Sequence, residues 1–242
     1  MTQKILAKLM SFAGSNKLGL FKIAIASSFL VIVPQGQVKA ALLTVANNSF
    51  EAPIITAPPG FTTVSSGTSN NWTFTGGTQQ GFANPVVAHN AGGSWYGPSP
   101  GIIPNGNQVA WSNGGTISQT LSATLQTNTI YTLGAYVGNR LGPNFPGYNI
   151  ELYAGGTLLA SNSGVTPVDG TFQAVTASYT SGISVTPGQA LEIRLTSLAR
   201  SNAQTNFDLI TLDAASIPEP SAILGLLGFG LLGIASKLRQ KQ

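Results

Sequence analysis

Short runs of Val, Ile, Thr and aromatic residues recur between clusters of Gly, Pro and Asn throughout the middle of this chain. No segment there keeps an apolar period of 3.6 residues, so the pattern is typical of strands joined by turns. We expect strands at residues 42–46, 71–75, 108–111, 116–121, 130–137, 148–153, 157–161, 172–179, 190–196 and 207–212. So many short strands predict an all-β domain, a two-sheet antiparallel β-sandwich.

Alternation within these segments predicts which side chains face the core. In residues 130–137 one face carries Tyr131, Leu133, Ala135 and Val137, as a half-buried strand requires. The same rule turns Glu151, Glu192 and Arg194 toward solvent. Gly155 and Gly156 supply the two positive-φ positions of a tight hairpin.

The composition limits how such a domain can be stabilised. The chain has no cysteine, so its fold must depend on apolar burial, sheet hydrogen bonds or a metal ion. Residues 41–216 suit one domain, and they contain all three Trp, all six Tyr and seven of the eleven Phe. That aromatic content predicts a folded domain despite the low charge.

The N-terminus predicts export. Four lysines precede an apolar core at residues 23–33, and Val38-Lys39-Ala40 offers a small-residue cleavage site, so residues 1–40 read as a signal peptide whether translation starts at Met1 or Met10. Eight of the eleven basic residues lie in the two terminal segments. Residues 41–216 hold three Arg against six acidic residues, a net charge of −3, which excludes nucleic-acid binding.

Residues 217–242 form a tripartite tail. Pro218, Glu219 and Pro220 open the motif at 218–221, an apolar segment follows at 222–236, and a basic end occupies 237–242. The tail resembles the PEP-CTERM sorting signal. That resemblance implies transient anchoring by a transmembrane helix, processing by an exosortase-type membrane protease, and a final location at the cell surface or outside the cell. The alternative is an ordinary stop-transfer anchor.

Three local motifs resemble the galactose-binding-like jelly roll of carbohydrate-binding modules: residues 47–51, 116–121 and 206–208. The alternative is another exported sandwich, such as an immunoglobulin-like one. The resemblance implies a structural calcium ion bound by Glu51 and Asp208, because hard cations take carboxylate oxygens. Both residues can instead be rim or cap residues paired with Arg194 or Arg200.

No catalytic constellation can be assembled from the sequence. His89 is the one histidine, there is no cysteine, and no carboxylate pair falls in an evident cleft. A lone histidine is more often a hydrogen-bonded structural residue than a base. We therefore expect a protein that is not an enzyme.

The segment from Asn84 to Trp111 carries the candidate ligand-binding residues. Sugars stack on flat aromatic rings and offer hydroxyls to polar side chains. Gly92-Gly93 and Gly97-Pro98 flank Trp95 and Tyr96 and favour their exposure, whereas Trp72 and Trp111 flank strands and are expected in the core. The candidate set is His89, Trp95, Tyr96, Tyr136, Asn139 and Arg140.

Together these patterns predict an exported, non-catalytic surface or matrix protein whose jelly roll interacts with extracellular polysaccharide. Two alternatives stay open. The domain can be a structural surface component without a specific ligand, or it can be a glycan-active enzyme if two carboxylates face each other across a groove.

Overall fold

The computed structural model describes residues 40–56, 60–85, 95–96, 103–198 and 202–218. These residues are all-β and form the strands β1 (Ala40–Leu43), β2 (Phe61–Thr63), β3 (Gly67–Ser69), β4 (Trp72–Thr75), β5 (Gln80–Ala83), β6 (Val109–Ser112), β7 (Gly115–Thr124), β8 (Thr129–Asn139), β9 (Tyr148–Ala154), β10 (Thr157–Asn162), β11 (Thr171–Thr180), β12 (Ala190–Ser197) and β13 (Thr205–Ser216).

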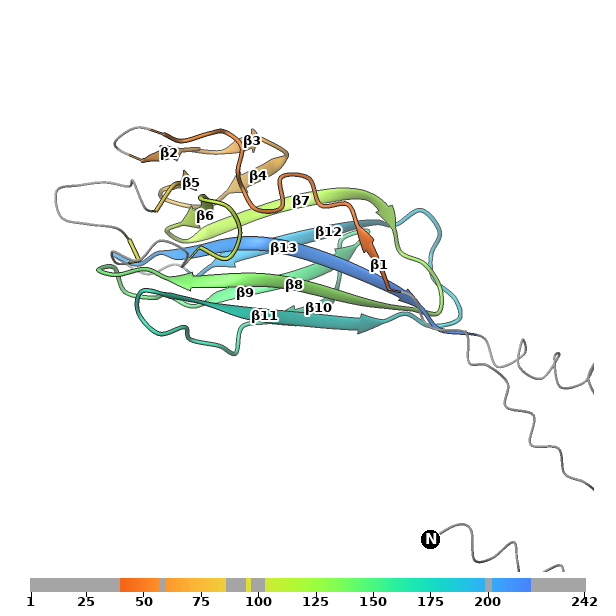
Figure 1. Cartoon of the computed structure of the whole chain (residues 1–242). Coiled ribbons are helices and arrows are strands. Elements are labelled where there is room, and N and C mark those ends of the chain that lie inside the picture. Colours follow the sequence, from red (N-terminus) through yellow and green to blue (C-terminus); the bar gives the residue numbers. More distant parts are fainter. Residues whose placement is uncertain (1–39, 57–59, 86–94, 97–102, 199–201, 219–242) are drawn as a thin grey trace, which may run out of the picture. The chain divides into compact units, whose positions relative to one another are not determined.

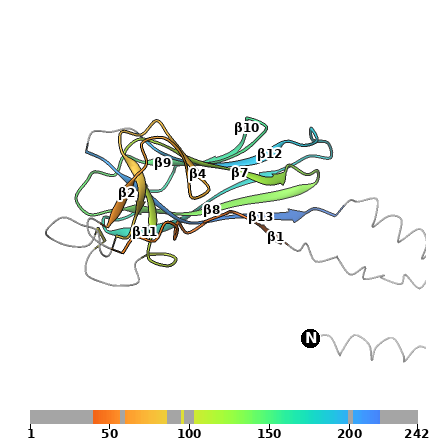
Figure 2. The same ribbon diagram turned by 90° about the horizontal axis from the view of Figure 1, so that it is seen from above.

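The strands build two antiparallel sheets that pack face to face (Figures 1 and 2). Sheet A has the order β11-β8-β13-β6-β5-β2, with β1 paired to the far half of β13, and sheet B has the order β10-β9-β12-β7-β4-β3. The predicted all-β, two-sheet antiparallel sandwich is confirmed. The expected signal-peptide helix and transmembrane helix lie outside the described residues.

Each of the ten expected strands overlaps an observed one, but three strands were missed. These are β2, β3 and β5, with the sequences FTT, GTS and QGFA. They are too short to show an alternating pattern, and they exist because longer neighbours provide hydrogen-bond partners. The first strand also ends at Leu43, before the turn in which Asn47 adopts a positive φ of 49°.

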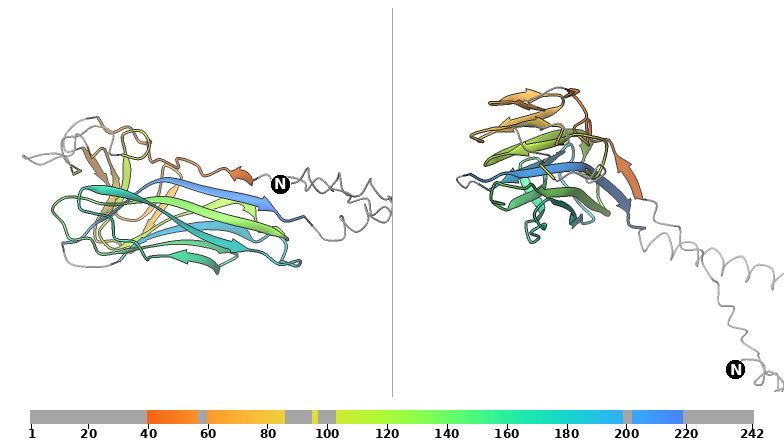
Figure 3. Two further views of the ribbon diagram at one scale, coloured as in Figure 1. Left: turned by 60° about the horizontal axis from the view of Figure 1, so that its bottom comes forward. Right: turned by 60° about the vertical axis from the view of Figure 1, so that its left-hand side comes forward.

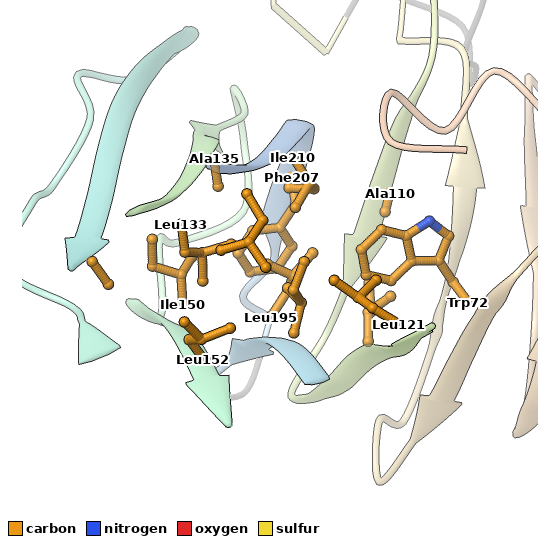
Figure 4. Close-up of a cluster of buried hydrophobic side chains, with 14 of the residues drawn as sticks. Trp72, Ala110, Leu121, Leu133, Ala135, Ile150, Leu152, Leu195, Phe207 and Ile210 are labelled. Carbon is orange, nitrogen blue, oxygen red and sulfur yellow. The ribbon is translucent and has the colours of Figure 1, made fainter. Parts of the chain in front are cut away.

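The core lies between the sheets (Figure 4). Phe207, Ile210 and Leu212 of β13 are fully buried there, opposite Leu195 of β12 and Ile150 of β9. The inward face predicted for β8 is confirmed, because its four members are at most 3% exposed. Trp72 is also fully buried, as expected.

The polar predictions for sheet B are confirmed as well. Gly155 and Gly156 form the β9–β10 turn with φ of 55° and 84°. Glu192 and Arg194 point outward and form an ion pair, with Arg194 Nε 2.8 Å from Glu192 Oε1.

Both ends of the described sandwich lie together. Ala40 of β1 is the register partner of Ala215 of β13. Figure 3 shows β1 beside the end of β13. The segments before and after the sandwich therefore join it at one end.

Leu195→Ala tests the core directly. Leu195 is fully buried, so its truncation should lower the free energy of unfolding by about 2–5 kcal/mol. Leu158→Ala is the matched control because Leu158 is 47% exposed, and it should change stability by less than about 0.5 kcal/mol. Urea unfolding measures both, and equal losses would contradict the described packing.

Candidate functional site

A second apolar cluster covers the outer face of sheet A, away from the main core. On β6, Ala110 belongs to the main core, whereas its neighbours Val109 and Trp111 belong to this second cluster. Because successive residues of a strand point to opposite faces, the second cluster must lie on the other side of the sheet. Trp95 and Tyr96 complete it from a connecting segment.

Trp95 and Tyr96 are buried, which corrects the expected exposure. Their exposed fractions are 5% and 3%. The guanidinium carbon of Arg140 lies 4.0 Å from the centre of the Trp95 ring, and Trp111 meets the same ring edge-on at 6.3 Å. The flanking glycines and proline suggested an open loop, but the outward apolar residues of sheet A need a cover, and these two rings provide it. Neither ring is a free stacking platform.

Tyr96 is held against the sheet by two contacts. Its ring packs on Phe172 with the centroids 4.5 Å apart, and its hydroxyl donates a hydrogen bond to Asn206 Oδ1. Position 138, beneath the Tyr96 ring, requires glycine, because a Cβ there would collide with the Tyr96 hydroxyl and the Phe172 ring. Burial raises the pKa of Tyr96 well above its ordinary value, so it stays a neutral hydroxyl.

A column of polar side chains runs along β13 beneath this cover. Gln204, Asn206 and Asp208 are 5%, 0% and 0% exposed, and they alternate with the inward Phe207. Gln204 Oε1 accepts from Arg140 Nη1 at 2.9 Å, Asn206 binds Tyr96, and Asp208 Oδ2 accepts from the backbone N–H of Asn105 at 2.9 Å. Asp208 was expected as a site residue, whereas Gln204 was not, and Asn206 was noted only as part of the motif at 206–208. The alternation of polar residues at 204, 206 and 208 around Phe207 could have revealed them.

A cavity of about 220 Å³ opens beside this column. Three aromatic residues line it: Phe61, Trp95 and Trp111. Its polar wall combines the Arg140 guanidinium with four side-chain amides, those of Gln79, Asn113, Asn202 and Gln204. A pocket with apolar rings and several fixed polar groups is the usual form of a small-ligand site.

Arg140 is the charged group of the cavity. Burial lowers its pKa from the ordinary value, and Tyr96 opposes that shift. Guanidinium groups nevertheless remain protonated in proteins. Of the candidate residues, Trp95 and Arg140 both line the cavity, whereas Tyr96 packs on Phe172 outside that lining.

The other candidate binding residues lie elsewhere. Tyr136 is the cross-strand partner of Asp208 on the outer face of sheet A, outside the cavity lining. Asn139 turns away and donates to Pro167 O and Asp169 Oδ1. His89, Glu219 and Pro220 lie outside the described residues.

Glu51 and Asp208 both accept hydrogen bonds from the backbone of the loop at residues 105–108. Glu51 Oε1 accepts from the backbone N–H groups of Asn107 and Gln108, each at 2.8 Å. Asp208 Oδ1 accepts from Leu209 N at 2.6 Å, at a bulge where Leu209 has a φ of 46°. Burial, with a smaller contribution from the nearby Glu51, raises the pKa of Asp208 to about 8, against the lowering by its two backbone hydrogen bonds.

Calcium takes carboxylate oxygens, but both Asp208 oxygens and Glu51 Oε1 already accept backbone hydrogen bonds, and Asp208 would have to lose its proton to bind the ion. Within the described ranges, no group of three or more His, Cys, Asp or Glu side chains gathers at one point, so carbonyls or water would have to complete the set. Arg194 does not pair with either carboxylate, because it binds Glu192. The alternative partner Arg200 lies outside the described residues.

No helix long and apolar enough to span a membrane occurs in the described part of the chain.

Comparison with known proteins identifies the class of the sandwich. The family model described as HpiC1 cyclase matches residues 41–213, which is more than half of the chain, and the model of the PEP-CTERM protein-sorting motif matches residues 216–240. The chain therefore belongs to the HpiC1-like family and carries a PEP-CTERM tail, the signal for export and sorting to the cell surface.

Solved cyclases from the cyanobacterial genus Fischerella share this fold. FisC from Fischerella sp. TAU, solved with (3Z)-3-(1-methyl-2-pyrrolidinylidene)-3H-indole, aligns with a TM-score of 0.57 and 26% identity over 74% of this chain and 100% of its own. An apo cyclase from Fischerella sp. aligns with a TM-score of 0.56 and 27% identity over 74% of this chain and 98% of its own. A cyclase from Fischerella sp. TAU in complex with 4-(1H-indol-3-yl)butan-2-one aligns with a TM-score of 0.54 and 26% identity over 74% of this chain and 100% of its own. No curated protein matches this chain.

The raised pKa of Asp208 predicts a pH-dependent stability in the presence of chelator. Between about pH 4 and pH 8 the folded state keeps a proton that the unfolded chain releases, so this contribution is complete below pH ~4 and is lost as the pH rises through about 8. The slope is at most ~1.4 kcal/mol per pH unit. Asp208→Asn should flatten it, with Asp213→Asn on the same strand as the control. Denaturant titrations at several pH values that show the same slope in Asp208→Asn would contradict the burial of a protonated carboxyl.

Calcium gives a separate prediction. An ion that binds Glu51 and Asp208 only in the folded state should add ~2.7 kcal/mol of stability at ~100-fold excess over its dissociation constant. Thermal melts with and without chelator measure this effect. An unchanged melting temperature would reject the site.

Proposed function

We propose that this protein is an exported cell-surface protein that binds extracellular polysaccharide through the cavity beside Arg140, without catalysing a reaction. The observation that supports the proposal is the composition of that cavity. Three aromatic residues, four residues with side-chain amides and one arginine line it. A sugar offers apolar C–H groups to the first kind of surface and hydroxyls to the second.

The packed state of Trp95 changes how a sugar would be recognised. Arg140 and Trp111 already occupy a face and an edge of that ring. We infer that ring edges and amides make the contacts, with the exposed amides of Gln79 and Asn202 at the rim and the buried Gln204 at the base. This favours recognition of a single sugar unit over stacking along a flat chain.

The position of the cavity suits a surface protein. Gln204 and Arg140 lie where β13 begins and β8 ends, while the sorting tail leaves the sandwich after Ser216 at the other end of β13. Twelve residues of strand at ~3.3 Å each separate the two by about 40 Å. A protein held by its tail would therefore present the cavity away from its attachment.

A second candidate function is suggested by the family. The Fischerella relatives are cyclases, and two of the structures named above hold indole compounds. The rings of Phe61, Trp95 and Trp111 offer an apolar wall to a flat indole. Asp208 would supply a carboxyl that is still protonated near neutral pH, but it does not line the cavity. The cyclase candidate therefore requires an opening of the 105–108 loop that the polysaccharide candidate does not.

One binding assay separates the two candidates. Affinity electrophoresis of the exported protein through polysaccharide gels should show retention, and the double variant Gln79→Ala/Asn202→Ala should weaken it about tenfold, because two hydrogen bonds contribute ~0.5–1.5 kcal/mol each. Asn149→Ala on the outer face of sheet B is the control and should bind normally. Saturable binding of 4-(1H-indol-3-yl)butan-2-one, with no retention by any polysaccharide, would favour the cyclase candidate instead.

We also propose that an exosortase-type protease processes the tail after transient membrane anchoring. Prolines at 218 and 220 favour an extended backbone that a protease can bind. Replacing Pro218, Glu219 and Pro220 together with Ala should leave a larger, membrane-retained form in the native host. Immunoblots of membrane and released fractions test this, and an unchanged size and location would refute the processing.

A further inference from the structure

We propose that the ligand of the Arg140 cavity carries a carboxylate, so that the polysaccharide is one containing uronic acid units. The inference rests on the proposed binding function and specifies its ligand. It comes from the charge of the cavity wall and from the direction in which its hydrogen-bond donors are arranged.

Arg140 has no anionic partner among the described residues. All six acidic residues of residues 41–216 are described, and Arg140 forms an ion pair with none of them. Its contacts there are neutral: Gln204 through Nη1 and the Trp95 ring against the guanidinium. Taking a guanidinium partly out of water without a counter-charge is costly, and a bound anion removes that cost.

The amides beside Arg140 are oriented by it. A guanidinium can only donate, so the Gln204 oxygen must face Arg140, and the Gln204 amide nitrogen must then point away. That nitrogen donates to Asn113 Oδ1 at 3.0 Å. Asn113 is left with its Nδ2 donors for the cavity that it lines. The chain of hydrogen bonds from Arg140 through Gln204 to Asn113 therefore has a donor at each end, the guanidinium at one and the Asn113 amide nitrogen at the other.

Two more donors of lining residues lack a partner. Arg140 Nε and Trp111 Nε1 are both buried and form no hydrogen bond in the described structure. An unsatisfied buried donor costs about 1–3 kcal/mol. These two atoms are closed off from the cavity surface, so it is the guanidinium charge and the amide donors of the lining that favour a ligand with acceptor oxygens and a negative charge.

A carboxylate fits better than a bulkier anion. It is planar and can accept two parallel hydrogen bonds from the fork of a guanidinium. The Trp95 ring lies 4.0 Å from the guanidinium carbon and Nη1 bonds Gln204 Oε1, so Nη2 is the guanidinium nitrogen left for such a partner. A sugar bearing a carboxylate at one carbon supplies both the anion and the hydroxyls.

The first test uses the unaltered protein and one polymer in two forms. Polygalacturonate and its fully methyl-esterified form have the same backbone and differ in the charged group. Calorimetric titration of the exported protein should show at least tenfold tighter binding of the acid form. Equal binding of both forms would overturn the carboxylate inference and leave polysaccharide binding intact, whereas no binding of either would overturn both. Tighter binding of dextran sulfate than of polygalacturonate would also overturn it.

The second test uses variants of the arginine. Arg140→Gln should weaken binding of the acid form at least tenfold and binding of the ester by a clearly smaller factor, because the ester loses only hydroxyl contacts to the guanidinium. Arg140→Lys should fall between the unaltered protein and Arg140→Gln for the acid form, because it keeps the charge and loses the fork. Arg194→Gln on sheet B makes the same change of charge outside the cavity and should bind as the unaltered protein does. Melting temperatures identify any variant that fails to fold. If a variant does not fold, the comparison of the acid and ester polymers on the unaltered protein decides whether the ligand carries a carboxylate. Equal loss of acid and ester binding in a folded Arg140→Gln would contradict the proposal.

Discussion

The pairing of β13 on both of its edges is the constraint on which the rest of the structure depends. It bonds to β8 along one edge, and to β6 and then β1 along the other. The alternation of its side chains thereby fixes two surfaces together: Phe207 packs into the core, while Asn206 and Asp208 face the outer layer. After Asp208 the bulge at Leu209 shifts the register, and the Asn48 carbonyl caps it by accepting from Ile210 N at 2.8 Å.

The outer layer of sheet A explains why the candidate site is packed as it is. Outward Val109 and Trp111 would be exposed without a cover, and Trp95 and Tyr96 supply that cover. Each covering ring is then tied to a polar group, Trp95 by the guanidinium of Arg140 and Tyr96 by Asn206. The polar column of β13 thus anchors an apolar cover, and the cavity lies where that cover meets the amides. The same arrangement leaves Arg140 half-buried, and no acidic side chain in the described part of the chain forms an ion pair with it.

The sequence was sufficient for features that depend on local alternation, and not for those that depend on distant partners. The inward face of β8, the Gly155-Gly156 turn and the outward Glu192 and Arg194 follow from period-two patterns. Strands β2, β3 and β5 could not be found, because their residues pair only where neighbouring strands are present. Trp95 and Arg140 were identified as candidates, but the ring's burial was missed, because a glycine-flanked loop does not reveal what it covers. Gln204 lies just before β13 begins at Thr205, where only the alternation of polar residues at 204, 206 and 208 marks its role.

The family and the fold permit both a binding protein and a cyclase, so the location of the ligand decides between accounts. We expect the ligand to enter the cavity on the outer face of sheet A and to meet Arg140. The decisive measurement is a crystal structure of the protein with a short galacturonate oligosaccharide. It should show a sugar carboxylate on the Arg140 guanidinium, with hydroxyls at the amides of Asn113 and Gln79. An oligosaccharide bound on sheet B, or one that leaves Arg140 untouched, would contradict it.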